Sequence, residues 1–442
     1  MITRKNFNKN NFIFGTATSS FQIEGGVDQD DRLPSIWDNF CDSPSKIVDG
    51  STGDVACDHY HKWEEDVELL HDLGVDAYRF SISWCRIITK QGEVNSKGIQ
   101  FYRKLLTKLK EKGIQSYVTL YHWDMPQWLE EQGGWLNRNT IHEFEKYADV
   151  ASRELGDLVN AWCTLNEPFC SAYLGYGIGV HAPGSVSDKN AFLAGHHLLL
   201  AHGLALKKIR TNNPGIPAGI VLNVTPGIPA TSSEQDAKAT EAWEELNVDW
   251  FFGPVFNQSY SDRLFQIWEG HNPPIEEGDM EIIGQTNDFV GINYYTVMRI
   301  RAESGSRFAV EETDTVERTD MGWEVNPDAF KNVLIKLSKD YPNLPPIYIT
   351  ENGMASRDEI VDGRVDDHQR LEYIQNHLDS LLQAINAGVD VRGYFLWSMM
   401  DNFEWAEGYT KRFGIYYVDY ASLKRTPKKS AVWFKEFLSS KK

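Results

Sequence analysis

The feature that most constrains this chain is a repeated alternation of short apolar runs with longer amphipathic segments. Eight runs have the length and composition of buried strands, and they lie at residues 12–18, 77–83, 116–122, 160–166, 218–224, 288–295, 346–350 and 392–397. The segments between them have helical periodicity, as at residues 98–113, 329–340 and 367–388. Strands that alternate with helices form a parallel sheet, because each helix returns the chain to the same edge of the sheet.

Eight such units predict a single α/β domain, a closed (β/α)8 TIM barrel with enlarged βα loops at its C-terminal face. An open doubly wound sheet is the alternative, but no Gly-x-Gly-x-x-Gly turn follows the first strand. No stretch has the composition of a linker between domains. The most polar segment, residues 301–320, follows the sixth run and is expected to be an enlarged loop. We therefore expect one barrel domain over residues 1–442.

The charge balance argues against several classes of partner. Lys and Arg number 44 against 63 Asp and Glu, so the formal net charge is −19. A charge of this sign opposes binding to nucleic acid and to anionic membranes. The chain also lacks an uncharged apolar run of the roughly 18 residues that a transmembrane helix needs. We expect neither nucleic acid nor a membrane as a partner.

The five cysteines indicate neither a disulfide framework nor a zinc site, since their number is odd and no two are spaced as Cys-x-x-Cys. The start of the chain is basic but lacks the apolar core of a signal peptide. These features predict the reducing cytoplasm as the location. The number of subunits is left open by the sequence.

Two of the eight runs end on a glutamate. The stretch TLNEP (164–168) ends the fourth run on Glu167, and ITENG (349–353) ends the seventh run on Glu351. A single glutamate at such a place is more often a strand end that meets solvent. In a (β/α)8 barrel, however, side chains at the carboxyl ends of the strands face one active site. We therefore expect Glu167 and Glu351 to meet above the barrel.

Two carboxyl groups that face one bound sugar suit the hydrolysis of a glycosidic bond. One group protonates the leaving oxygen, and the other attacks the anomeric carbon; a separation of about 5 Å gives retention through a covalent intermediate. Their mutual repulsion raises the pKa of one group, which then carries the proton. We assign Glu351 as the nucleophile, because Arg79 and Tyr295 are placed to keep it ionised. Glu167 is then the acid/base.

Seven motifs resemble, in order and over nearly the whole chain, those of the family 1 glycoside hydrolases, the β-glucosidase family. They are FIFGTATSSFQIEGG (12–26), TLYHWDMPQWL (119–129), TLNEP (164–168), GINYYT (291–296), MGWEVNP (321–327), YITENG (348–353) and LWSMMDNFEWAEGYTKRFGIYYVDY (396–420). The resemblance implies a retaining exo-β-glucosidase that acts on β-D-glucosides, such as disaccharides of the cellobiose kind, and on some β-galactosides or β-fucosides. It implies no metal ion and no organic cofactor.

The resemblance also implies individual roles. Glu351 corresponds to the nucleophile and Glu167 to the acid/base. The residues that bind the substrate are Gln22, His122, Trp123, Asn166, Tyr295, Trp323, Trp397, Glu404 and Trp405. The groups that support the nucleophile are Arg79, Asn293 and Tyr295. These residue types suit a sugar, which needs polar partners for its hydroxyls and an aromatic ring under its C–H face.

Glu404 narrows the substrate to an unmodified sugar, since a carboxylate there accepts hydrogen bonds from the C4 and C6 hydroxyls and repels a 6-phosphate. A 6-phospho-β-glycosidase is the first alternative, and the nearby basic pair Lys411 and Arg412 favours it slightly. A non-catalytic sugar-binding barrel is the second, which the presence of both glutamates opposes. Phe169, where many relatives have Trp, leaves the leaving-group preference open, because its ring is expected to contact the aglycone.

Overall fold

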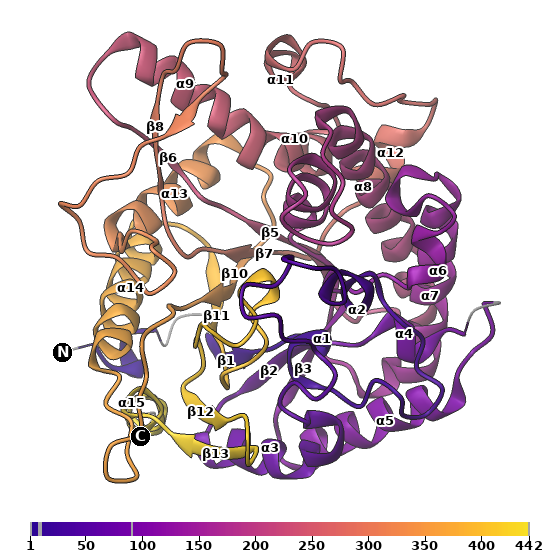
Figure 1. Cartoon of the computed structure of the whole chain (residues 1–442), viewed down its shortest axis with the longest axis vertical. Coiled ribbons are helices and arrows are strands. Elements are labelled where there is room, and N and C mark those ends of the chain that lie inside the picture. The colour runs from indigo at the N-terminus through magenta and orange to yellow at the C-terminus, as the bar shows by residue number, and fades with distance from the viewer. Residues whose placement is uncertain (1, 8–10, 90–91, 441–442) are drawn as a thin grey trace.

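The structure, a computed structural model, describes residues 2–7, 11–89 and 92–440. Eight parallel strands close into a barrel in the order β1-β11-β10-β7-β5-β4-β3-β2 (Figure 1). These strands are β1 (Ile13–Ala17), β2 (Ala77–Ser81), β3 (Gln115–Tyr121), β4 (Ala161–Asn166), β5 (Ala218–Asn223), β7 (Phe289–Asn293), β10 (Ile347–Asn352) and β11 (Val391–Trp397). Each corresponds to one of the eight predicted runs, so the TIM-barrel prediction is confirmed and the open sheet is excluded.

Helices surround the barrel (Figure 1). The longer ones are α3 (His59–Leu73), α5 (Ser96–Glu111), α7 (Asn139–Leu155), α8 (Asp188–Asn212), α9 (Glu234–Glu244), α10 (Trp250–Asn257), α13 (Pro327–Asp340), α14 (His368–Asn386) and α15 (Lys429–Ser439). The shorter ones are α1 (Ser20–Ile23), α2 (Ile36–Cys41), α4 (Trp84–Ile87), α6 (Gln127–Glu130), α11 (Asp262–Ile267) and α12 (Asp279–Ile283). Short 3-10 or π-helical segments are η1 (Arg4–Phe7), η2 (Gly134–Leu136), η3 (Gly156–Leu158), η4 (Cys170–Gly177), η5 (Glu245–Asp249) and η6 (Trp405–Glu407).

Helix α5 illustrates why these segments fold as they do. The side chain of Asn95 accepts a hydrogen bond from the backbone N–H of Lys97 at 3.1 Å, which satisfies a donor that the helix itself leaves free. Apolar residues then recur at helical spacing, and Tyr102, Leu106 and Leu109 are all buried. This spacing gathers them on one face of the helix, which packs toward the barrel.

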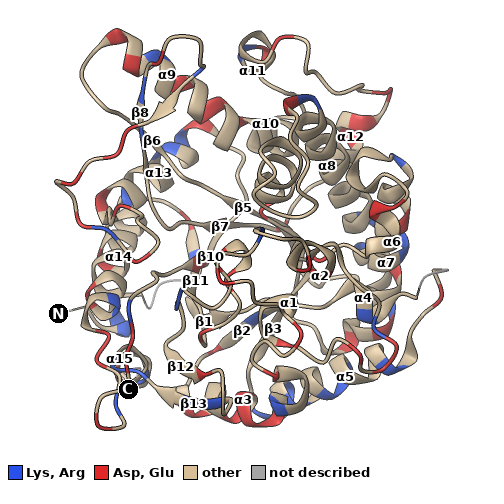
Figure 2. Cartoon of the chain, viewed as in Figure 1, with Lys and Arg blue, Asp and Glu red and all other residues tan. Residues whose placement is uncertain are grey.

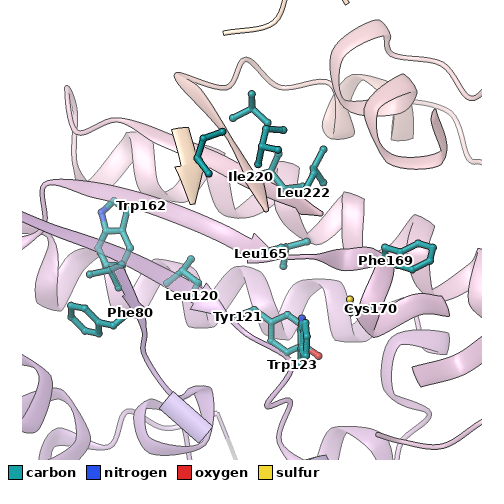
Figure 3. Packing of buried hydrophobic residues seen from close by; sticks show 14 of the residues in the cluster. Phe80, Leu120, Tyr121, Trp123, Trp162, Leu165, Phe169, Cys170, Ile220 and Leu222 are labelled. Atoms are coloured by element: carbon teal, nitrogen blue, oxygen red, sulfur yellow. The ribbon is translucent and has the colours of Figure 1, made fainter. Parts of the chain in front are cut away.

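Two apolar layers form the core. Successive side chains of a strand point to opposite faces, so Tyr117 of β3 points into the barrel and Val118 points toward the helices. Inside, the ring of Tyr117 lies 6.5 Å from that of Phe289 and 5.0 Å from that of Phe395. Figure 3 shows part of the outer layer, with Phe80, Leu120, Trp162, Leu165, Ile220 and Leu222. The aromatic rings fill the interior near the amino ends of the strands, which leaves the carboxyl ends for a site.

Two small sheets extend the loops. One contains β6 (Gly227–Pro229), β8 (Met298–Arg301) and β9 (Ala309–Val310), and the other is the hairpin of β12 (Tyr416–Asp419) and β13 (Lys424–Pro427). The polar segment 301–320, expected to be an enlarged loop, therefore includes the end of β8 and the whole of β9. Strands this short leave no hydrophobic period in the sequence, so their pairing could not be predicted.

Charged residues lie mostly on the outer helices and loops (Figure 2). Within the eight barrel strands, all of which the structure describes, the charged residues are Arg79, Glu351 and Arg392. Arg392 is exposed near the start of β11, whereas Arg79 and Glu351 are buried and face each other inside the barrel. Among the described helices, none combines the length and apolarity that crossing a bilayer requires.

Candidate active site

Glu167 and Glu351 lie at the carboxyl ends of two strands that are not neighbours. Glu351 is the next-to-last residue of β10, and Glu167 directly follows β4. Both are buried, with Glu351 3% exposed and Glu167 6% exposed. In the closed barrel, β7 and β5 lie between these strands. Asn293 at the end of β7 is in register with Glu351, and its side chain reaches Glu167.

A bulge in β10 turns Glu351 into the barrel. The pairing of β10 with β7 shifts register between Ile349 and Glu351. Thr350 Oγ1 donates to Asn293 Oδ1 at 2.6 Å, and the next residue, Glu351, accepts a hydrogen bond from Arg79 inside the barrel. In a regular strand one of two consecutive side chains would point to the helices instead. The bulge thus lets two adjacent residues face the interior, the carboxylate of Glu351 and the hydroxyl that holds Asn293.

A continuous chain of hydrogen bonds joins the two glutamates. Arg79 donates to Glu351 Oε1 at 2.6 Å and, through its other terminal nitrogen, to Asn166 Oδ1 at 2.6 Å. The amide of Asn293 donates to the same Asn166 oxygen at 3.1 Å and to Glu167 Oε1 at 2.7 Å. Every group in the chain is held by at least one neighbour, so the carboxyl groups are fixed relative to each other before a ligand binds.

Two neighbours of Glu351 offset the effect of burial, which disfavours the charged form of its carboxyl group. Arg79 contacts Oε1, and the Tyr295 hydroxyl donates to Oε2 at 2.6 Å, so both oxygens are engaged. Burial raises the pKa of Glu351 above its ordinary value, while the charge of Arg79 and the hydrogen bond from Tyr295 oppose that rise. Arg79 and Tyr295 thus stabilise the charged form of this buried carboxyl group.

Glu167 has weaker partners and no cation in contact. Burial, followed by repulsion from Glu351, raises the pKa of Glu167 to about 7. Its hydrogen-bond partners are the neutral amide of Asn293 and the thiol of Cys170, which lies 3.1 Å from Oε2. The backbone of Glu167 is left-handed, with φ 45°, a conformation that costs energy for a residue with a side chain. Of the two glutamates, Glu167 is therefore the one suited to carry a proton near neutral pH.

His122 contacts Asn166 through one ring nitrogen and leaves the other without a partner. Its Nε2 lies 3.1 Å from Nδ2 of Asn166, and an amide nitrogen only donates, so Nε2 is the acceptor and the proton sits on Nδ1. Burial and the charge of Arg79 hold the pKa of His122 well below its ordinary value, which keeps the ring neutral. Within the described residues, the buried Nδ1 has no hydrogen-bond partner. A buried donor without a partner in the protein is a position at which an acceptor from outside the protein would be stabilising.

Gln22 and Glu404 lie side by side on a second edge of the site. Gln22 Nε2 donates to the backbone carbonyl of Phe403 at 2.9 Å and approaches Glu404 Oε2 at 3.4 Å. Asn402 Oδ1 accepts from the same nitrogen at 3.0 Å, and the Ser19 hydroxyl donates to Gln22 Oε1 at 2.7 Å. The Gln22 amide is thus oriented from both ends.

Glu404 lies close enough to Glu351 and Glu167 to be affected by their charges. Burial and repulsion from Glu351 and Glu167 raise the pKa of Glu404 to about 8. The carboxyl group is therefore protonated at neutral pH, and it offers one donor and one acceptor to a pair of hydroxyls. The carboxylate that the sequence led us to expect here is present only above that pH or once the neighbouring charges are removed.

Aromatic rings form a wall along one side of the site. The His122 ring stacks with Trp397 at 5.8 Å and with Trp405 at 5.9 Å between centroids. Trp123 packs against Trp405 at 4.5 Å, and its Nε1 donates to the backbone oxygen of Asn166 at 2.9 Å. The N–H of Trp123 is therefore already in use, and only its ring is left for a sugar.

Trp323 lies beside Tyr295, whereas the ring of Phe169 is packed in another aromatic cluster. Trp323 is half-buried, with its ring 5.5 Å from that of Tyr295. Phe169 is only 5% exposed and packs against the rings of Tyr173 at 5.2 Å and Trp243 at 6.4 Å. Figure 3 shows Phe169 just beyond the end of the β4 segment, within the outer apolar layer. Its ring is thus held in an aromatic cluster rather than standing free to contact an aglycone.

The basic pair Lys411 and Arg412 is bound to other groups. Lys411 Nζ donates to the backbone oxygen of Asp320 at 2.6 Å and lies 3.4 Å from its carboxylate. Arg412 pairs with Asp401 at 2.6 Å and lies over the ring of Tyr417 at 4.0 Å. Neither cation is left for a phosphate group at the sugar edge.

Sequence reasoning named Arg79, Asn293 and Tyr295 as supporting residues but missed four others. Thr350, Asn402 and Ser19 orient the side amides described above, and Cys170 contacts Glu167. Of these, only Cys170 had a local signal, since it lies three residues after Glu167 at the start of a helical turn. The other contacts join segments far apart in the chain and have no signature in a single sequence.

Comparison with known proteins identifies close relatives. The family model described as glycosyl hydrolase family 1 matches residues 3–442. A β-glucosidase from Agrobacterium sp. is 44% identical over 97% of this chain and 94% of its own length. A bifunctional β-D-glucosidase/β-D-fucosidase from Bifidobacterium breve is 41% identical over 97% of both chains. The crystal structure of a β-glucosidase from Exiguobacterium antarcticum B7 superposes with a TM-score of 0.95, at 42% identity and with 98% of both chains covered.

Proposed function

The chain belongs to glycosyl hydrolase family 1 and is a retaining β-glucosidase, and from this premise we propose that Glu351 is its nucleophile and Glu167 its acid/base. One observation carries the assignment. Glu351 is held by the cation Arg79 and by Tyr295, whereas Glu167 is held only by neutral donors. The charged member of the pair attacks, and the protonated member serves the leaving group.

In the first step, a carboxylate oxygen of Glu351 forms a bond to the anomeric carbon as the bond from that carbon to the leaving oxygen breaks. Glu167 gives its proton to the leaving oxygen, so the aglycone departs as a neutral alcohol. Arg79 and Tyr295 hold the attacking group in the barrel. The products of this step are a glucosyl ester on Glu351 and an ionised Glu167.

The second step reverses the roles. Formation of the ester removes the charge on Glu351, and repulsion from that charge is one of the causes of the raised pKa of Glu167. The pKa of Glu167 therefore falls, and its carboxylate accepts a proton from water as the water oxygen attacks the anomeric carbon. The ester bond to Glu351 breaks, and glucose leaves with the β configuration of the substrate.

The polar edge of the site accounts for recognition of the terminal sugar. We assign the free Nδ1–H of His122 to a sugar hydroxyl oxygen and the Gln22 and Glu404 pair to neighbouring hydroxyls on the same edge. Asn166 lies beside both glutamates and is assigned to the 2-hydroxyl. Trp397 provides the aromatic face under the ring, flanked by His122.

The substrate is an unmodified β-glucoside rather than a 6-phosphate. A protonated Glu404 repels a phosphate less than a carboxylate would, so this preference depends chiefly on Lys411 and Arg412, which are already paired with Asp320 and Asp401. We extend the substrates to β-fucosides, since the Bifidobacterium breve relative is bifunctional. Disaccharides of the cellobiose type are the proposed natural class.

Several broader features complete the proposal. Residues 1–442 form one catalytic domain, and the reaction needs no cofactor, nucleic acid or membrane. The five cysteines are all buried and unpaired, which supports a reducing compartment such as the cytoplasm. The active site draws on strands from β1 to β11, so we expect no part of the barrel to act alone.

The decisive experiment removes each glutamate and supplies azide. In Glu351→Ala, activity on an aryl β-glucoside should collapse, and azide should attack the anomeric carbon directly and yield the α-glucosyl azide. In Glu167→Ala, a substrate with an activated leaving group should still form the ester, and azide should then yield the β-glucosyl azide. Glu324→Gln is the matched control, because Glu324 is a buried glutamate whose carboxylate pairs with Arg299 rather than with a residue assigned to the reaction. Full activity in either alanine variant would end the assignment.

A further inference from the structure

We propose that Cys170 is a positioning residue for Glu167, which holds the carboxyl group in place while that group releases and recovers its proton. The inference deepens the proposed function and rests on the role of Glu167 as acid/base. Cys170 does not touch the reacting atoms in this scheme. It acts through its contact with Glu167 Oε2, the oxygen that the amide of Asn293 leaves free.

Cys170 contacts Glu167 through both its backbone and its side chain. Its backbone N–H donates to the backbone oxygen of Glu167 at 2.9 Å, and its Sγ lies 3.1 Å from Oε2. The two contacts close a turn around the left-handed backbone of Glu167. Cys170 begins η4, and Phe169 just before it is locked into the aromatic cluster, so the thiol is attached to a rigid part of the fold (Figure 3).

The geometry decides which oxygen of Glu167 carries the proton. An amide N–H only donates, so Oε1, which faces Asn293, accepts a hydrogen bond in both protonation states. The transferable proton must then reside on Oε2, beside Cys170. The partner of Oε2 therefore influences how easily this proton is given to the leaving oxygen and how readily it is recovered from water.

A thiol suits this position better than a stronger partner. When Glu167 is ionised, the S–H group donates to Oε2 and keeps the carboxylate aligned. When Glu167 is protonated, sulfur is only a weak acceptor and does not retain the proton. Burial, together with the adjacent Glu167 carboxyl, raises the pKa of Cys170 well above its ordinary value, so the group stays a thiol at neutral pH.

Other charged groups also act on Glu167, and the experiment must be read against them. Glu351 raises its pKa and Arg79 lowers it. Further titratable side chains within electrostatic reach of this carboxyl are Tyr295 and Glu404. All of these remain unchanged when only Cys170 is replaced, so a shift in the pH profile reports the contact with sulfur.

The test compares Cys170→Ser and Cys170→Ala on two substrates. An alkyl β-glucoside needs a proton on its leaving oxygen, whereas 2,4-dinitrophenyl β-glucoside does not. For the alkyl substrate we expect kcat/KM to fall by about threefold to tenfold in both variants, the usual effect of one altered hydrogen bond. For the dinitrophenyl substrate we expect formation of the ester to change by less than about twofold.

The pH profiles should move in opposite directions. A serine hydroxyl stabilises the carboxylate more than a thiol does, so Cys170→Ser should shift the basic limb of kcat/KM to lower pH. Alanine removes the donor, so Cys170→Ala should shift that limb to higher pH. A residue that merely fills space would not produce shifts of opposite sign.

Cys41→Ser is the matched control, because Cys41 is also 8% exposed and its thiol lies near the backbone of Gly53 instead. Equal losses on both substrates with an unmoved basic limb, or full activity in both Cys170 variants, would overturn the proposal. Should Cys170→Ala not fold, the near-isosteric Cys170→Ser still decides it. Failure of the underlying assignment looks different, since Glu167→Ala would then keep its activity on the alkyl substrate.

Discussion

Asn293 and Glu167 are joined by a hydrogen bond of 2.7 Å that passes over an entire strand. Asn293 ends β7 and Glu167 follows β4, with β5 between them in the barrel. Such a bond forms only where the strands curve around a common axis and their last side chains point inward. Asn293 thus supports Glu167 across the mouth of the barrel, and it is also paired with Glu351 on the neighbouring strand β10.

Replacement of Asn293 by alanine should reduce catalysis without unfolding the protein. The change removes a donor from Glu167 and leaves Thr350 without its acceptor. Loss of a hydrogen bond to an ionisable group corresponds to about 1.5 to 3 kcal/mol, or roughly 10-fold to 100-fold in kcat/KM. Steady-state kinetics on cellobiose, with circular dichroism as the control for folding, would check this. A loss below threefold would mean that Asn293 does not support the acid/base.

The pH dependence of kcat/KM should differ between leaving groups. Glu167 must be protonated to act as the acid, and its pKa is raised to about 7, so activity on cellobiose should fall as the pH rises through that value. A dinitrophenyl glucoside needs no proton and should keep its kcat/KM to higher pH. Rates measured from pH 5 to pH 9 on both substrates test this. Identical basic limbs would contradict the assignment of Glu167.

Glu404→Gln should stabilise the fold at weakly alkaline pH. The pKa of Glu404 is raised to about 8 in the folded chain, so the folded state binds its proton more tightly than the unfolded state does. The resulting contribution to the free energy of unfolding is complete below the unfolded pKa and is lost as the pH rises toward about 8. Glutamine resembles the protonated form and avoids that loss.

The melting temperature of Glu404→Gln should therefore exceed that of the parent chain by about 2 °C near pH 8 and by less near pH 5. Its KM for an aryl β-glucoside near neutral pH should change by less than about threefold, because the amide, like the protonated carboxyl group, offers a donor and an acceptor. Glu404→Ala removes both and should raise the KM at least about 10-fold. Differential scanning calorimetry at both values of pH measures the first effect. A stability difference that is the same at both would show that the Glu404 proton is not linked to folding.

Lys428→Met should destabilise the protein strongly, although Lys428 is outside the site. Its ammonium group is fully buried and lies 2.6 Å from both Asp358 and Asp401. Removal of the cation leaves two buried carboxylates undercompensated, which costs about 3 to 5 kcal/mol. Chemical denaturation would measure the loss. Lys429→Met is the matched control, because Lys429 is 47% exposed and its pair with Asp366 contributes about 1 kcal/mol or less.

The sequence was sufficient for the architecture and for the chemical groups, but not for how they are held. The eight barrel strands could be predicted because runs such as those that end on Glu167 and Glu351 are apolar, short and followed by turn residues. The orientation of Phe169 could not be predicted, because its ring packs into an aromatic cluster formed by residues of η4, α9 and α10, which are separate in the sequence. The contact between Cys170 and Glu167 could not be predicted either. It depends on the left-handed backbone of Glu167, which the following Pro168 alone does not specify.

The bulge in β10 has a consequence for anyone who would transplant this chemistry into another scaffold. An idealised barrel strand alternates strictly, and a glutamate copied onto the position after an inward threonine would be aimed at the surrounding helices. A cation placed inside the barrel to pair with that glutamate, as Arg79 pairs with Glu351, would then have no carboxylate partner. A workable graft must carry the additional residue along with the carboxylate, since the defect in the ladder, rather than the amino acid alone, is the transferable unit.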